Sequence, residues 1–322
     1  MQRRQFLQAS LLALATPAAL AQAGWPQQAV RLIVPFPPGG GTDTVSRLLA
    51  EKLTTLKKWN VIVDNRPGAA GNIGLDAVAK APADGYTLGM AQTSNLAINP
   101  ALYSKMLFDS LTDFQAIGEV CAQPVVLVVR DDSPFRTLAD FVKQAGLHPG
   151  KYTLAQAGMG TVGHLAGEML VRSAKIKVLQ VPYKGAGPAM NDLLGNQVDT
   201  YIGSSASVMS QLQTGKIRAL AVTSAQRLKA LPDVPTVAEQ GHPGFEATTW
   251  LGLVGPAKLP PELVQAINRE LVHILAQPDV QERLVAEGNV PTPGTPQAFQ
   301  KLIRDEHAKW GKLIREANIR ID

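Results

Sequence analysis

The stretch RLIVPFPPGGGTDTVSRLLAEKL, residues 31–53, joins an apolar run to a proline- and glycine-rich loop and then to an amphipathic segment. The run at residues 29–36 has the composition of a buried strand, and from Thr42 onward apolar residues recur at the spacing of a helix. A strand, a glycine loop and a helix in this order are the first half of a βαβ unit. The loop between them presents its backbone amides at the start of the helix.

The same alternation of strand and helix continues along the chain. Residues 61–65 and 86–92 read as strands with a helix between them, which completes one βαβαβ unit. After a long apolar run at residues 116–130, strand-like segments recur between helical ones up to about residue 224. We therefore predict an α/β fold whose sheets are mostly parallel and flanked by helices.

Two long apolar segments divide this pattern into two lobes. They lie at residues 116–130 and 245–256, and we expect the chain to cross between the lobes at both. Lobe one would then comprise residues 24–122 plus 246–322, and lobe two residues 123–245. Helices beginning near Pro260 and Thr295 would pack on lobe one and leave a cleft between the lobes.

Composition excludes some classes of protein. Of the 322 residues 45% are hydrophobic and 18% charged, which is typical of a globular chain with a sizeable core. The 31 Lys and Arg against 26 Asp and Glu give a net charge of +5, but the basic residues are scattered and aromatics are few, so we expect no nucleic-acid partner. Cys121 is the only cysteine, and no intramolecular disulfide can form.

The first 23 residues have the features of a signal peptide. A basic start with Arg3 and Arg4 precedes an apolar stretch too short to span a bilayer, and Ala21-Gln22-Ala23 is a small-x-small cleavage site. The arginine pair resembles a twin-arginine signal, although an ordinary Sec signal fits as well. We expect export to the periplasm with cleavage near Ala23.

Five loops rich in Gly, Ser and Thr follow strands and open helices. Ligands bind at the carboxyl ends of strands in open α/β sheets, and helix N-termini favour anions. Lys184 and His164 are the only cationic or potentially cationic residues in these loops, so backbone amides and hydroxyls would hold an anion. The loops are PPGGGTD at residues 37–43, QTSNLAINP at 92–100, GMGTVGHL at 158–165, PYKGAGPAM at 182–190 and GSSAS at 203–207.

Catalytic and cofactor motifs are missing from these loops. The glycine loop lacks the Gly-Lys-Ser/Thr ending of a phosphate-binding loop and the G-x-G-x-x-G spacing, and GSSAS lacks the last glycine of the hydrolase elbow. The chain has no HExxH motif and no Cys/His cluster, so we expect no cofactor, no metal and no enzyme. The alternative is an exported hydrolase that uses Ser204 or Ser205 with His164.

Each candidate residue also has a simpler structural interpretation. The three glycines could form only a turn, Asp43 could cap its helix, and His164 could pack in the core. Lys184 could be a solvated loop charge. Trp250, in the second apolar segment, is better explained as packing than as a ligand platform.

Several longer motifs resemble the Bug or TctC family of extracytoplasmic solute receptors, the binding components of tripartite tricarboxylate transporters. The resemblance runs from about Trp25 to the C-terminus, in family order and at similar spacing. The motifs are VPFPPGGGTD, VDNRPGAAGNIG, ADGYTLGMAQTSNLAINP, VPYKGAGPAMNDLLGNQVD, RALAVTSAQRLKALPDVPTVAEQG and WLGLVGPAKLPPELVQAINREL.

The resemblance implies a two-lobed, type II-like periplasmic binding protein that closes on a small carboxylate without catalysing a reaction. It implies a monomer that delivers the ligand to a membrane permease, or that serves a sensor instead. Family members hold the carboxylate with backbone amides and hydroxyls, partly through water. The matching residues are Phe36, Gly40, Gly41, Thr42, Asp43, Thr93, Ser94 and Asn95 in lobe one, and Gly160, Thr161, His164, Lys184, Gly185, Ser204 and Ser205 in lobe two.

One segment departs from the family pattern. Many relatives carry an aromatic residue and an aspartate after the QVD motif, whereas Tyr201-Ile202-Gly203-Ser204 stands here. No carboxylate is then offered to a ligand amine at that point. The resemblance therefore implies a ligand without an amino group, and an amino acid that bound as tightly as the best dicarboxylate would contradict this hypothesis.

Overall fold

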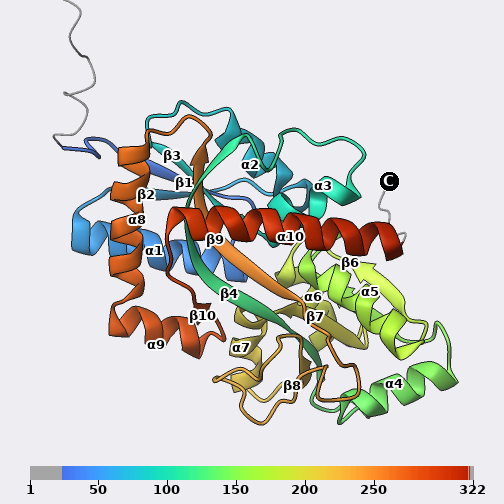
Figure 1. The fold of residues 1–322 in the computed structure, drawn as a ribbon. Helices are drawn as coiled ribbons and strands as arrows, with labels where there is room; N and C mark the ends of the chain where they lie inside the picture. Colours follow the sequence, from blue (N-terminus) through green and yellow to red (C-terminus); the bar gives the residue numbers. More distant parts are fainter. Residues whose placement is uncertain (1–23, 318, 320–322) are drawn as a thin grey trace, which may run out of the picture.

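A computed structural model describes residues 24–317 and 319 of the chain (Figure 1). The predicted signal peptide at residues 1–23 lies outside these residues. The elements are β1 Val30–Val34, α1 Gly41–Lys57, β2 Val61–Asn65, η2 Ala69–Gly71, α2 Asn72–Ala79, β3 Thr87–Gln92, η3 Ser94–Ile98, α3 Asn99–Leu102, β4 Phe114–Arg130, α4 Leu138–Leu147, β5 Thr153–Gln156, α5 Val162–Ala174, β6 Leu179–Pro182, α6 Ala186–Leu194, β7 Thr200–Ser204, α7 Ser205–Gln213, β8 Ile217–Val222, β9 Thr248–Pro256, α8 Pro261–Leu275, α9 Pro278–Ala286, β10 Val290–Pro291 and α10 Pro296–Ala317.

The first sheet has the order β2-β1-β3-β9-β4, with β10 also paired to β4. Strands β2, β1 and β3 are parallel to one another, and β9 lies antiparallel between β3 and β4. The expected βαβαβ unit forms the parallel part of this sheet. Its helices begin directly beyond the carboxyl ends of the strands, as short loops require.

The second sheet has the order β6-β5-β7-β4, with β8 on the other side of β4. Strands β5, β6 and β7 are parallel, and β4 is antiparallel to both β7 and β8. In the first sheet β9 and the two-residue β10 run against the other strands, and in the second sheet β4 does. Strands β9 and β4 belong to the segments that cross between the sheets. The predicted mostly parallel sheets and two crossovers are both present.

Strand β4 changes partners at Pro124. Up to that residue it pairs with β9, and from Val125 it pairs with β7. Proline has no N–H to donate, which suits a position where one ladder ends and another begins. We propose the lobe boundaries expected from the sequence, residues 24–122 plus 246–322 and residues 123–245, because this change of partners falls at Pro124 and β9 returns to the first sheet at Thr248.

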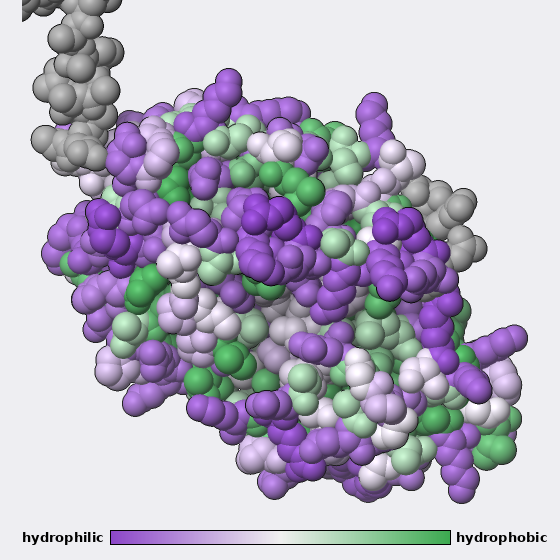
Figure 2. Space-filling view, in the orientation of Figure 1, coloured by the Kyte–Doolittle hydropathy of each residue, from purple (hydrophilic) through white to green (hydrophobic). Residues whose placement is uncertain are grey.

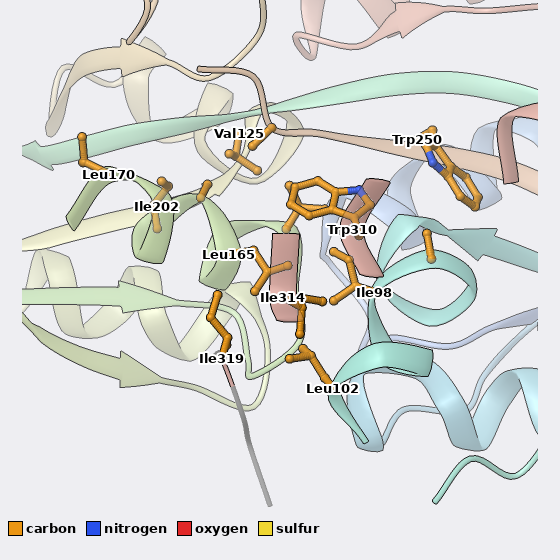
Figure 3. Packing of buried hydrophobic residues seen from close by; sticks show 14 of the residues in the cluster. Ile98, Leu102, Val125, Leu165, Leu170, Ile202, Trp250, Trp310, Ile314 and Ile319 are labelled. Atoms are coloured by element: carbon orange, nitrogen blue, oxygen red, sulfur yellow. The ribbon is translucent and has the colours of Figure 1, made fainter. Parts of the chain in front are cut away.

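Helix α10 lies across the two crossing strands β4 and β9 (Figure 1). Gly252 of β9 allows this approach, since a Cβ at that position would lie 2.0 Å from the ring of Phe299 on α10. Farther along the helix, Trp310 and Ile314 pack in one apolar cluster that includes Ile98 from lobe one and Leu165 from lobe two (Figure 3). The last helix therefore joins the cores of both lobes.

The outer face of α10 is hydrophilic, as the space-filling view of the same side shows (Figure 2). None of the helices within residues 24–317 is both long enough and apolar enough to cross a bilayer.

Two further apolar clusters lie under α1 and α8 in lobe one and under α6 and α7 in lobe two. Each sheet is thus covered on both faces, which is what parallel strands need.

Candidate ligand-binding cleft

Two adjoining cavities lie between the lobes. The first, here called the Gly41 cavity, has a volume of about 130 Å³, and the second, the Lys184 cavity, one of about 430 Å³. Both are lined from lobe one and from lobe two, and they share Phe36, Pro37, Thr161 and Gly185. A ligand in this cleft would contact both lobes.

Four helices begin at the wall of the Gly41 cavity. The residues concerned are Gly40 to Thr42 at α1, Thr161 to Gly163 at α5, Gly185 to Pro188 at α6, and Gly203 and Ser204 before α7. The first amides of a helix have no acceptor within it, and the helix dipole adds positive potential at that end. One helix comes from lobe one and three from lobe two, so an anion between the lobes would be stabilised from both sides.

Charged side chains are almost absent from this cleft. None lines the Gly41 cavity, and Lys184 alone lines the neighbouring cavity, as far as residues 24–317 show. No anionic side chain lines the cavity; the one carboxylate in the first turn of these helices, Asp43 of α1, is paired with Arg47 and lines neither cavity. The electrostatics of the cavity favour an anion held by amides and hydroxyls, as the glycine-rich loops predict.

The two lobes touch at glycines on the rim of the cleft. A Cβ on Gly41 would lie 2.9 Å from Oγ of Ser204 in lobe two, and a Cβ on Gly185 would lie 3.3 Å from Cγ of Pro37 in lobe one. A Cβ on Gly160 would likewise lie 2.7 Å from Oδ1 of Asn99. Small residues at these positions let the lobes approach closely.

Asp43 stabilises the glycine loop and does not line either cavity. Its Oδ2 accepts hydrogen bonds from the Gly39 amide and from Nε of Arg47, each at 2.9 Å, and its Oδ1 accepts one from Nδ2 of Asn65 at 2.9 Å. Burial acts to raise the pKa of Asp43, but these hydrogen bonds outweigh it and hold the pKa below its ordinary value. Its carboxylate thus fixes the loop that carries Gly40 and Gly41.

The loop after β3 is buried behind the cavities. Oγ1 of Thr93 accepts a hydrogen bond from the Trp250 amide at 2.9 Å, and Oδ1 of Asn95 accepts one from the Gln92 amide at 3.0 Å. Within the part of the chain that the structure describes, Oγ of Ser94 and Nδ2 of Asn95 have no hydrogen-bond partner. These three residues line neither cavity, and the structure places only Gln92 of this region at the wall.

His164 is buried inside the first turn of α5. Its Nδ1 accepts a hydrogen bond from the Gly160 amide at 3.3 Å, and burial lowers the pKa of His164 to about 4. The ring is neutral at pH 7 and shapes the loop before α5. Thr161 caps the same helix, because its Oγ1 accepts from the His164 amide at 3.2 Å, and it lines both cavities.

The two serines at the start of α7 differ in their environment. Ser204 lines the Gly41 cavity, whereas Ser205 is fully buried and its Oγ donates to the carbonyl oxygen of Gly288 at 2.8 Å. With Ser205 bonded to Gly288 and Nδ1 of His164 bonded to Gly160, no Ser205–His164 pair is poised for nucleophilic attack. Among residues 24–317 and 319, no group of three or more His, Cys, Asp and Glu side chains is placed to hold a metal ion.

Three residues that line the Gly41 cavity from strands were not predicted from the sequence. Gln123 of β4 and Thr249 of β9 face each other in register, and Tyr201 lies on β7. The one available signal for Gln123 was a polar residue inside the long apolar run at residues 116–130. Which face of a strand a side chain occupies depends on register, so Tyr201 could not be assigned from the sequence.

A two-lobed α/β binding-protein fold with an anion-favouring cleft defines the class of this protein. The sequence matches the tripartite tricarboxylate transporter family receptors, TctC, over residues 45–319. The chain belongs to this family, whose members are solute-binding receptors and not enzymes. The resemblance found in the sequence is thereby confirmed.

Individual relatives support this assignment over nearly the whole chain. The UPF0065 protein in the tcbD-tcbE intergenic region of Pseudomonas sp. is 39% identical over 98% of this chain and 94% of its own length. Protein BugT of Bordetella pertussis is 35% identical over 92% of this chain and 91% of its own.

Solved structures share the fold. R. palustris Rpa4515 with adipate has a TM-score of 0.90 at 34% identity, covering 92% of this chain and 100% of the other. MatC from Rhodopseudomonas palustris with bound malate has a TM-score of 0.84 at 31% identity, covering 90% and 99%. The predicted periplasmic-binding-protein fold is confirmed, and both of these relatives hold carboxylates.

Proposed function

We propose that this protein is a periplasmic receptor that captures a small carboxylate between its lobes and delivers it to the permease of a tripartite tricarboxylate transporter. The observation that carries the proposal is the meeting of four helix N-termini from both lobes at a cavity without charged side chains. A carboxylate suits such a site because each of its oxygens can accept several amide hydrogen bonds. The adipate and malate bound by two relatives support the same ligand class.

The cleft offers a place for each end of a dicarboxylate. One carboxylate would bind the amides of residues 40–42 and 185–187 in the Gly41 cavity. The other would extend into the adjoining cavity, where Lys184 supplies the cationic side chain. Thr161 and Phe36 would contact the ligand from the shared wall. A ligand that touches both lobes binds the closed form better and shifts the population toward it.

A binding screen tests the receptor function directly. The purified protein is titrated with adipate, malate, succinate and citrate, and with amino acids and sugars as negative classes, by thermal shift and calorimetry. A carboxylate that binds only the folded state raises the melting temperature by mass action, so we expect a selective rise with one carboxylate class. Binding of a sugar or an amino acid in preference to every carboxylate would contradict the proposal.

Export and delivery need separate experiments. Cell fractionation should find the protein in the periplasm with residues 1–23 removed, and replacing Arg3 and Arg4 by lysines distinguishes a twin-arginine route from Sec export. Uptake of the labelled carboxylate should fall when the gene is deleted. Unchanged uptake with intact binding would favour a sensor in place of a permease partner.

A further inference from the structure

Tyr201 and Gly203 both belong to the wall of the Gly41 cavity. Tyr201 lies on β7, is fully buried, and packs in the apolar cluster under α6 and α7. Gly203 lies two residues farther along the same face of the strand. A Cβ on Gly203 would be 2.1 Å from Oη of Tyr201 and 2.2 Å from its Cζ. The hydroxyl therefore occupies the volume in which a side chain of residue 203 would begin, and both residues line the cavity.

This hydroxyl has no good acceptor among the described residues. Oη of Tyr201 lies 3.4 Å from Oγ of Ser207, which is longer than an ordinary O–H···O hydrogen bond. Ser207 uses its own proton to donate to the carbonyl oxygen of Ser204 at 2.7 Å. The phenol proton is thus left with a long, weak contact in a buried environment, where an unmet donor is costly.

We propose that Tyr201 donates a hydrogen bond to a carboxylate oxygen of the ligand and that Gly203 makes this possible by leaving the space for the ring. This inference rests on the proposed function, since it requires an anionic ligand in the Gly41 cavity. Burial raises the pKa of Tyr201 to about 12, so the hydroxyl remains protonated and able to donate at any physiological pH. The phenol adds a neutral donor to the helix amides that surround it.

The pair also determines the class of ligand. With glycine at position 203 and tyrosine over it, this wall offers donors and no carboxylate. A ligand ammonium placed here would face helix N-termini and a phenol proton without an anionic partner, which is costly in a buried site. Hydroxy- and dicarboxylates, whose oxygens all accept hydrogen bonds, fit the same wall. The site should therefore bind malate in preference to aspartate. The two ligands differ in one group, a hydroxyl in malate and an ammonium in aspartate.

Calorimetric titrations of three forms of the full protein test the inference. Adipate, malate, succinate and aspartate are titrated into the wild type, Tyr201→Phe and Ser207→Ala, and the melting temperature of each form is measured without ligand. Tyr201→Phe keeps the ring and removes the donor. Ser207→Ala removes the only acceptor that the described residues offer to that donor. We expect Tyr201→Phe to weaken binding of the best carboxylate about tenfold, the loss for a hydrogen bond to a charged group, and Ser207→Ala to leave it unchanged.

Each other outcome overturns the inference. If the wild type binds a carboxylate and Tyr201→Phe binds it equally well, the donor role is wrong and the receptor function stands. Equal losses of affinity and melting temperature in both variants would assign Tyr201 a structural role through Ser207. Aspartate binding as tight as malate binding would contradict the ligand class. If none of the carboxylates binds the wild type, this inference fails together with the proposed function.

Discussion

The side-chain amide of Gln123 donates a hydrogen bond to the backbone carbonyl of Gly41, with 3.2 Å between Nε2 and the oxygen. Gln123 belongs to β4, at the point where that strand passes from one sheet to the other, and Gly41 is the first residue of α1. The bond thus joins the crossover segment to a helix end that faces the cleft. Both residues line the Gly41 cavity, so this hydrogen bond links the crossover strand to the cavity wall.

Replacing Gln123 by glutamate should abolish most carboxylate binding. The change keeps the size of the side chain but places a negative charge in a cavity that now has none, and like charges a few ångströms apart in a protein interior repel strongly. We expect affinity for the best carboxylate to fall at least about tenfold at pH 7.5. Gln115→Glu, on the same strand and outside the cavity, is the matched control, and an equal loss in that variant would contradict the explanation.

Adding a methyl group at Gly41 should hinder closure of the lobes. In Gly41→Ala the new Cβ would lie 2.9 Å from Oγ of Ser204 and 3.1 Å from Cβ of Ala206, both in lobe two. We expect affinity to fall by about tenfold, because the ligand can then contact only one lobe well. Gly40→Ala should cost much less, because its Cβ would have only the Pro37 carbonyl oxygen of lobe one within 4 Å, at 3.8 Å. Small-angle scattering with ligand would show whether Gly41→Ala stays open.

The sequence predicted most of the fold because its signals were local. The apolar run before the glycine loop and the helical spacing after it correspond to β1 and α1, within two residues at each start. Helix α9 and strand β10 were not predicted. Strand β10 has two residues, and only its pairing with Cys121 and Ala122 makes it a strand. A contact between segments so far apart in the chain leaves no periodic pattern to read.

The candidate site was predicted less completely than the fold, because the type of a residue does not reveal which way its side chain points. Four of the five predicted loops line the cleft, since a backbone amide at a helix start faces outward whatever its side chain, whereas only Gln92 of the loop at residues 92–100 does. Asp43, His164 and Ser205 were predicted as ligand contacts from the family resemblance, yet their polar atoms bond to other residues of the protein. Their predicted contacts with ligand stay untested. Tyr201 received no role from the sequence, because a sequence does not show that its ring lies over Gly203.

Trp310 should be one of the larger single contributors to stability. It is fully buried, its Nε1 donates to Oε2 of Glu306 at 2.7 Å, and it packs in the cluster that joins the lobes. Trp310→Ala should lower the free energy of unfolding by about 3–5 kcal/mol, the usual cost of truncating a buried tryptophan. Denaturant unfolding measures it. Lys312→Ala, on the exposed face of the same helix, should change it by less than about 0.5 kcal/mol. A similar loss of unfolding free energy in both variants would show that the stability depends on the helix as a whole and not on the contacts of Trp310.

His164 should make the protein less stable as the pH falls from about 6.5 to 4. Burial lowers the pKa of His164 from its ordinary value of 6.5 to about 4. Between these two pH values the histidine is protonated in the unfolded chain and neutral in the folded chain. The stabilisation is complete above pH 6.5 and lost as the pH falls through the folded pKa. At 1.36 kcal/mol for each pKa unit, the change amounts to about 3 kcal/mol.

The variant His164→Asn isolates this contribution. Oδ1 of asparagine can accept the Gly160 amide as Nδ1 does, while the side chain cannot titrate in this range. We expect the variant to be less stable than the wild type at pH 7 and to approach or pass it near pH 4, as measured by urea unfolding at each pH. Carboxylates that titrate in the same range affect both proteins alike, so the difference between the two curves belongs to position 164. If the stabilities of the two proteins changed with pH in parallel over the whole range, His164 would be solvated or protonated in the folded state. That result would contradict a buried, neutral ring.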